Sequence, residues 1–214
     1  MRDPPDMGYA PGGISMSSAL IQVKVFCSVL LFTFAASVSQ AAAFSLEEDY
    51  DTLKDSGQNF VVIGTICEEV ARLEMAQEFQ EPQYHVVTGI AYGNSKKTIG
   101  ELDVIVFENK SQDVVKIAEV KCWKDQAGGL TKALDQRKRF LKNIQKGGID
   151  MRSTHDNRQY SAKQFRKCKD FETIGQQGSK DYGYDRELAH SLEDLMGLRT
   201  RIMNCQSTGE CKQP

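Results

Sequence analysis

Hydrophobic and polar residues follow two different periods along this chain, and these periods predict its secondary structure. Within Ser56–Gln80, apolar residues recur every three or four positions, as on one face of a helix, and Pro82 ends the pattern. The next segments are rich in Val, Ile, Thr and Tyr, which predicts strands over Tyr84–Tyr92, Thr98–Phe107 and Val114–Trp123.

A second amphipathic segment and a less regular tail complete the pattern. Leu130–Gln145 carries apolar residues at helical spacing between two pairs of adjacent glycines, so it predicts a long helix. Further along, Phe171–Ile174 predicts a short strand and Glu187–Met203 a final helix, with a Gly-rich loop over Gly175–Asp185. This order predicts an α/β fold in which helices flank a central mixed sheet.

Residues 1–43 have the pattern of a secretory signal peptide with an upstream extension. Val25–Ala36 is an apolar run preceded by Lys24 and followed by small residues up to Ala43. The run is too short to cross a hydrocarbon core comfortably, because that takes about 20 residues. We therefore predict a cleaved signal peptide, a periplasmic or secreted product, and no stable membrane insertion after cleavage. Residues 1–15 are unlike the start of such a signal, which favours Met16 as the initiator.

The chain beyond residue 43 has the length and composition of one globular domain. The sequence is 40% hydrophobic and 26% charged, which excludes a disordered or fibrous protein. We expect a domain over 44–204, followed by a short Cys-containing tail over 205–214. Five cysteines lie beyond residue 43, and Cys205 and Cys211 are close enough in sequence to form a disulfide. The odd count leaves at least one thiol unpaired or paired with another chain.

Charge is unevenly distributed, although the net charge is only -2. Phe44–Glu81 has ten acidic and two basic residues, whereas Lys110–Lys180 has seventeen basic and eight acidic ones. A basic half can attract phosphates even in an acidic protein, but an uneven solvated surface has the same pattern. The same two interpretations stay open for Arg137 and Arg139, which lie in a basic run on the second predicted helix.

Three of the charged residues in the apolar second and third predicted strands are candidates for chemistry. Asp103 lies in the middle of the second strand, and Glu119 and Lys121 lie in the third. Because alternate side chains of a strand share a face, Glu119 and Lys121 point the same way, opposite to the apolar Ala118 and Val120. Burial of such charges is costly unless they pair or bind a cation, and Mg²⁺ accepts carboxylate and carbonyl oxygens.

These two strands carry a recognisable motif. Gly-Glu-Leu-Asp over 100–103, followed by Ala-Glu-Val-Lys over 118–121, resembles the signature of the PD-(D/E)xK nuclease superfamily. Restriction endonucleases and archaeal Holliday-junction resolvases belong to this superfamily, and the element order over 56–145 is similar to its core. The resemblance implies a three-layer restriction-endonuclease-like core of order αβββαβ. It also implies hydrolysis of phosphodiester bonds with Mg²⁺ or Mn²⁺. The tail from Lys146 onward is not covered.

The resemblance also implies the roles of individual residues on the two strands. Asp103 and Glu119 would be metal ligands, with the carbonyl oxygen of Val120 as a third. Lys121 would be the catalytic lysine, which positions or deprotonates the attacking water and offsets negative charge in the transition state.

Two helices add further candidates. Many members of the superfamily contribute a glutamate from the first helix, and Glu69 is chosen over Glu68 because it lies beside the apolar residues of that helix. Gln136 matches a position where members often carry Gln or Lys near the site. Trp123, directly after the third strand, could stack on a nucleic-acid base, although a hydrophobic anchor at the strand end is the more ordinary interpretation.

The sequence therefore predicts an exported metal-dependent nuclease that acts on nucleic acid, with DNA preferred over RNA. A homodimer is left open, because many members of the superfamily dimerise. Two alternatives from other classes also remain. A catalytically inactive nuclease-like scaffold would bind nucleic acid or a protein partner without turnover. A plain exported α/β domain would use Glu119 and Lys121 as a structural ion pair and bind neither metal nor DNA.

Overall fold

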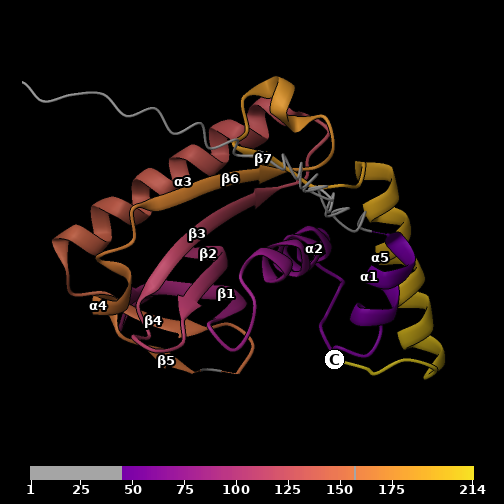
Figure 1. Ribbon diagram of the computed structural model, residues 1–214, viewed down its shortest axis with the longest axis horizontal. Helices are drawn as coiled ribbons and strands as arrows, with labels where there is room; N and C mark the ends of the chain where they lie inside the picture. Colours follow the sequence, from indigo (N-terminus) through magenta and orange to yellow (C-terminus); the bar gives the residue numbers. More distant parts are fainter. Residues whose placement is uncertain (1–44, 157) are drawn as a thin grey trace, which may run out of the picture. The chain divides into compact units, whose positions relative to one another are not determined.

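The computed structural model describes residues 45–156 and 158–214, which fold around one mixed β-sheet (Figure 1). The predicted signal peptide and the start at Met16 fall on residues 1–44, outside the described residues. The strands are β1 Tyr84–Asn94, β2 Lys97–Glu108, β3 Val114–Lys121, β4 Asp150–Ser153, β5 Gln159–Tyr160, β6 Asp170–Gly175 and β7 Arg186–Glu187. The helices are α1 Leu46–Leu53, α2 Ile63–Glu78, α3 Gln126–Lys146, α4 Ala162–Phe165, the 3-10 helix η1 Ser179–Tyr182, and α5 Leu192–Thr208.

The seven strands form a sheet with antiparallel and parallel parts. Their spatial order is β5-β4-β1-β2-β3-β6-β7. From β5 to β3 all neighbours are antiparallel, whereas β6 is parallel to β3 and β7 is parallel to β6. A parallel pair needs a crossover connection, and the chain between β3 and β6 contains α3, which packs against both strands. The α/β class and the central mixed sheet predicted from the sequence are thereby confirmed.

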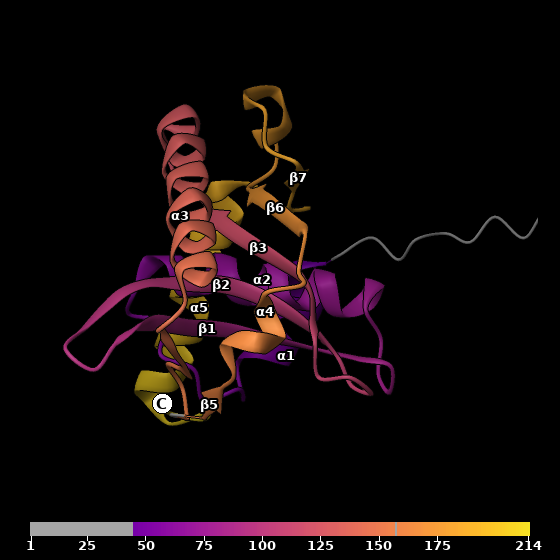
Figure 2. The same cartoon turned by 90° about the vertical axis from the view of Figure 1, so that its left-hand side faces the viewer.

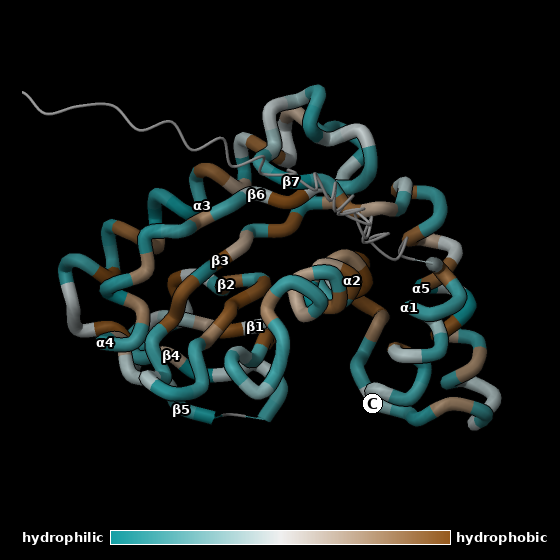
Figure 3. The backbone as a smooth tube through the Cα atoms, in the orientation of Figure 1, coloured by the Kyte–Doolittle hydropathy of each residue, from teal (hydrophilic) through white to brown (hydrophobic). Residues whose placement is uncertain are grey.

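Helices cover both faces of the sheet. In Figures 1 and 2, α3 runs along one face, while α2 lies on the other, with α1 and α5 beyond it. Each face has its own hydrophobic cluster: one joins α2 and α5 to β2 and β3, and the other joins α3 and α4 to an aromatic group around Phe107 and Phe140. Figure 3 shows hydrophobic segments along the central strands and on α2. The carboxyl end of β3 therefore lies between two well-packed layers.

Several element boundaries differ from the sequence prediction for local reasons. The first predicted helix begins at Ile63 and not at Ser56, because the chain turns before it through Gly57, whose φ is 74°. The short α1 was not predicted; Ser45 caps it, and its Leu53 is fully buried. The second predicted helix begins earlier than expected, at Gln126, because the Asp125 side chain caps it.

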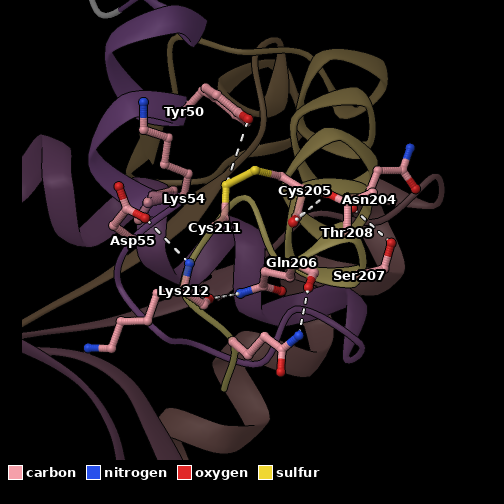
Figure 4. The surroundings of a disulfide bond; sticks show 12 residues. Tyr50, Lys54, Asp55, Asn204, Cys205, Gln206, Ser207, Thr208, Cys211 and Lys212 are labelled. Atoms are coloured by element: carbon pink, nitrogen blue, oxygen red, sulfur yellow. Dashed lines mark hydrogen bonds between the residues drawn. A yellow bond between two sulfur atoms is a disulfide. The ribbon is translucent and has the colours of Figure 1, made fainter.

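The C-terminal residues are part of the fold and do not form a separate tail. Helix α5 extends to Thr208, and a disulfide joins Cys205 in its last turn to Cys211 (Figure 4). This is the pair that the sequence favoured. The backbone N–H of Lys212 donates to Asp55, which lies just beyond α1, at 3.3 Å. Among the described cysteines, Cys168 is the free thiol.

Candidate functional site

Asp103 on β2 is fixed against β3 at the point where the ladder between the two strands ends. The paired register of β2 and β3 ends at Val104 and Ala118. One residue further, Oδ2 of Asp103 accepts the backbone N–H of Val120 at 2.8 Å, so a side chain replaces the ladder hydrogen bond. Asp103 is only 5% exposed. Its carboxylate is therefore held beside the end of β3.

The Lys121 ammonium is surrounded by oxygen atoms from three residues. Its Nζ lies 2.6 Å from Oδ2 of Asp103, 2.8 Å from the carbonyl oxygen of Val120 and 3.7 Å from Oε2 of Glu119. Burial alone would lower the pKa of Lys121, but the charges of Asp103 and Glu119 raise it more, so the net pKa lies above its usual value. These three oxygen donors, which the sequence resemblance assigns to a metal ion, thus converge on one positive charge.

The Glu119 carboxylate is buried without a hydrogen bond. Glu119 is 0% exposed, and neither of its carboxylate oxygens has a hydrogen-bond partner within the described residues. The Lys121 ammonium, at 3.7 Å, is too far away to donate one. Burial, and then the negative charge of Asp103, raise the pKa of Glu119 to about 9. Such an unsatisfied buried acceptor is uncommon in folded proteins, and a bound ion is one explanation for it.

The first core helix brings Glu68, and not the predicted Glu69, towards Asp103. Glu69 is 2% exposed, and its two oxygens accept from Thr88 and from Arg72, each at 2.7 Å. Glu68 instead lines the same cavity as Asp103. Burial, and then the Asp103 charge, raise the pKa of Glu68 to about 8. Glu69 therefore lies on the apolar helix face, as expected, but its carboxylate accepts hydrogen bonds from partners there and does not line the cavity.

Of the three residues predicted on helix α3, one lines the cavity. Gln136 lines the cavity, and its side-chain oxygen is buried without a hydrogen-bond partner among the described residues. The positive charge of Arg139 acts on Glu119, where it opposes the rise in pKa. The Arg137 guanidinium instead lies 5.4 Å from the ring centroid of Phe171 and lines a different hollow. Arg137 is therefore a packing residue in this structure.

A second disulfide ties together the two elements that carry the site. It joins Cys67 on α2 to Cys122, directly after β3, across 55 residues of sequence. Cys67 precedes Glu68, and Cys122 follows Lys121. This pair was not predicted, because the two cysteines have no characteristic spacing in the sequence and meet only when α2 packs on the sheet. The bond fixes the helix carboxylate relative to the strand that bears the lysine.

The start of α3 packs closely against the same strand end. A Cβ at Gly129 would lie 2.5 Å from the Tyr184 hydroxyl, 3.5 Å from Cβ of Lys121 and 3.6 Å from Cβ of Trp123. A side chain at Gly129 would therefore push the helix away from β3. The glycine pair that the sequence analysis took as the opening of the helix lies inside its first turn, where it permits this close approach.

An open cavity with a volume of about 710 Å³ lies over these residues. Its lining includes the polar residues Glu68, Glu101, Asp103 and Lys121. It also includes the apolar residues Ile63, Trp123, Leu192 and Met196, which we call the apolar wall. Trp123 is 45% exposed, so it is not the hydrophobic anchor that its place at the strand end had suggested. Glu101 belongs to the Gly-Glu-Leu-Asp motif but was given no role from the sequence, and the apolar residues of α5 were not singled out because they belong to no motif.

The donor atoms at this site fit a hard divalent cation. Asp103, Glu119 and the Val120 carbonyl offer oxygens of the kind that Mg²⁺ and Mn²⁺ prefer, and both oxygens of Glu119 lack hydrogen bonds. Within residues 45–156 and 158–214, however, no group of three or more Asp, Glu, His or Cys side chains is arranged so that it could hold a metal ion. The Lys121 ammonium lies where the oxygens converge.

Comparisons with known proteins add no assignment. No family model matches the chain, and neither the curated proteins nor the solved structures contain a significant match to it. In the part of the chain that the structure describes, no helix is both long and apolar enough to cross a membrane.

Proposed function

We propose that this protein is a nuclease that hydrolyses phosphodiester bonds with Mg²⁺ or Mn²⁺, acting on DNA rather than RNA. The observation that carries the proposal is the convergence of oxygens from Asp103, Val120 and Glu119 on one positive charge. Beside it, the Glu119 carboxylate has no hydrogen-bond donor among the described residues. Both features are typical of residues arranged to hold a cation near a phosphate.

Each residue of the cluster has a role that follows from its chemistry. Asp103, Glu119 and the Val120 carbonyl would hold the cation, and Glu68 takes the place first given to Glu69. A bound divalent cation supplies Lewis-acid chemistry: it neutralises charge on the phosphate and lowers the pKa of water. The Lys121 ammonium is a donor that can orient the attacking water and offset the charge of the transition state. Arg139 and Gln136 would contact the nucleic acid.

The fold and the disulfides are consistent with this proposal. The order α2, β1, β2, β3, α3, β6, with β4, β5 and α4 between α3 and β6, supports the proposed restriction-endonuclease-like core. Its two central helices lie on opposite faces of the sheet, as three layers require. The chain also contains two disulfides, which form and persist in oxidising compartments. They support an exported product. The net charge of -2 is no obstacle, because α3 carries the basic residues Lys132, Arg137, Lys138, Arg139, Lys142 and Lys146.

The test is a cleavage assay with matched lysine variants. We expect the purified protein to cut plasmid and single-stranded DNA with Mg²⁺ or Mn²⁺ but not with a chelator. Asp103→Ala and Lys121→Ala should each lose activity by on the order of a hundredfold or more, the scale of general acid–base and positioning effects. The matched control is Lys116→Ala, because Lys116 lies on the same strand and its side chain is also 11% exposed, but it pairs with Glu172 and Asp170.

The control separates catalysis from stability. Lys116→Ala should lower the melting temperature and keep the cleavage rate, whereas both site variants should keep a folded circular dichroism spectrum and lose the rate. Full activity in both site variants would refute the assignment.

The catalytically inactive scaffold remains the second candidate, because the Lys121 ammonium already occupies the point where the oxygens converge. That function predicts salt-dependent DNA binding without turnover under any metal.

A further inference from the structure

The apolar wall of the cavity has no role in phosphodiester chemistry. Phosphates, metal ions and water need charged and polar partners, yet Ile63, Leu192, Met196 and Trp123 face the same space as the carboxylates. Ile63 is 57% exposed and Trp123 is 45% exposed. Large apolar side chains that stay exposed beside a polar site indicate that part of the natural ligand is apolar.

Trp123 is held in place although its ring is exposed. It follows Lys121 by two residues, and its carbonyl oxygen accepts from Nε2 of Gln176 at 2.9 Å. The first turn of α3 lies against its Cβ at Gly129, and the disulfide at Cys122 fixes the preceding residue. The backbone below the indole is therefore fixed by three neighbours. A planar side chain that is fixed at its base and open at its face is suited to stacking.

We propose that this apolar wall binds an unpaired base of single-stranded DNA, stacked on Trp123, while the backbone phosphate of the same strand lies at Asp103, Glu119 and Lys121. The inference rests on the proposed nuclease function and adds the strandedness of its substrate. In a duplex each base is paired and stacked, so it reaches Trp123 only after unpairing and unstacking. A base of a single strand is free to enter without that cost.

The polar groups around the cavity agree with a nucleotide as occupant. The acidic side, with Glu68, Glu101 and Asp103, takes a phosphate only together with a cation, as the proposed chemistry requires. Stacking on an aromatic ring is tolerant of base identity, so little sequence preference is expected.

The decisive experiment uses the emission of Trp123, which is the sole tryptophan of the whole sequence. The full-length protein is titrated with a short oligothymidylate whose phosphorothioate links resist hydrolysis, in the presence of Mg²⁺. We expect saturable quenching of the emission by the single strand. A blunt duplex of the same length should leave the emission nearly unchanged. Binding of the single strand without any quenching, followed in parallel by anisotropy of a labelled oligonucleotide, would overturn the base pocket.

Variants then separate this inference from the nuclease itself. Trp123→Ala should weaken single-strand binding by at least about fivefold, the lower end of what one base–aromatic stack contributes, and Trp123→Tyr should retain most of it. Tyr182→Ala is the matched control, because Tyr182 is also a half-exposed aromatic residue but does not line the cavity. The affinity of Tyr182→Ala for the single strand should equal that of the unmodified protein.

The cleavage rates complete the comparison. If Trp123→Ala and the unmodified protein cut single strands and duplexes at equal rates, the base pocket is wrong and the nuclease stands. If nothing is cut with any metal but the single strand still quenches Trp123, the nuclease is wrong and the base pocket stands as a binding site.

Discussion

At the scale of single residues, Lys121 and Glu119 belong to one cluster but differ in their hydrogen bonding. The Lys121 ammonium has two hydrogen-bond acceptors within 2.8 Å, whereas the Glu119 carboxylate has no donor among the described residues. A buried acceptor without a partner costs about 1–3 kcal/mol of stability. An apolar side chain at Glu119 would avoid that cost, so its carboxylate is better explained by a ligand than by the stability of the fold.

The neighbouring glutamates of α2 give a paired test of site and structure. Glu68→Gln removes an ionisable carboxyl group beside Asp103, and we expect cleavage to fall by tenfold or more with the fold intact. Glu69→Gln removes a charge that is bonded to Arg72 and Thr88. It should lower the free energy of unfolding by about 1–3 kcal/mol, because it weakens buried hydrogen bonds to a charged group, and leave the cleavage rate nearly unchanged.

The two variants are measured by urea unfolding and by initial rates at saturating Mg²⁺. Each serves as the control for the other, because they make the same substitution at adjacent positions. A loss of rate in Glu69→Gln with full activity in Glu68→Gln would reverse the assignment and restore the original choice.

At the scale of elements, the sequence could identify what is long and periodic. β1, β2 and β3 were recognised because each is a long run of β-branched and aromatic residues. The other strands are short: β4 has four residues, and β5 and β7 have two each. Such segments are too short to show an alternation of hydrophobic and polar residues, and they form by pairing with strands already in the sheet.

The faces of the central strands were only partly predictable. Thr88 bonds to Glu69 of α2, whereas Ile90, two residues later, belongs to the cluster beside α3. Strict alternation would put both on one face; the change occurs at Gly89, whose φ is 67°. Asp103 lies on β2 between Leu102 and Val104, which belong to different clusters. The strand pattern could therefore select Asp103, Glu119 and Lys121. A helical wheel, however, could not decide which α2 carboxylate would reach them.

The two disulfides should differ in their effects on stability and on cleavage. Cys67–Cys122 spans 55 residues and Cys205–Cys211 spans six, so loop-closure entropy predicts stabilities of about 4 and about 2 kcal/mol respectively. We expect the double variant Cys67→Ser/Cys122→Ser to lose cleavage as well as stability, because α2 is then free to shift relative to β3. Cys205→Ser/Cys211→Ser should lose stability alone. The measurements are guanidinium unfolding and cleavage rates at a temperature where both variants are folded.

These double variants are each other's control, since both replace one disulfide by two hydroxyls. Equal retention of activity by the two variants would show that the α2–β3 bond has no part in positioning the site.

At the scale of the whole molecule, charge is distributed in a way that suits an anionic polymer held by a cation. The acidic stretch Phe44–Glu81 includes α1 and α2, and the basic stretch Lys110–Lys180 includes α3. The candidate site lies where these two meet, between α2 and the carboxyl end of β3. With a net charge of only -2, the protein has little long-range attraction or repulsion for DNA. Binding should therefore depend on a few local contacts from α3.

Arg139 and Arg137 test that dependence, because they are two identical side chains on one helix with different surroundings. Arg139 acts on Glu119 at the site, whereas Arg137 packs over Phe171. We expect Arg139→Ala to weaken single-stranded DNA binding and to reduce the slope of log affinity against log salt by about 0.7, the value for one lost phosphate contact. Arg137→Ala should leave the slope unchanged and slightly lower stability. Anisotropy titrations across a series of salt concentrations give both slopes, and equal slopes for the two variants would place the DNA path away from Arg139.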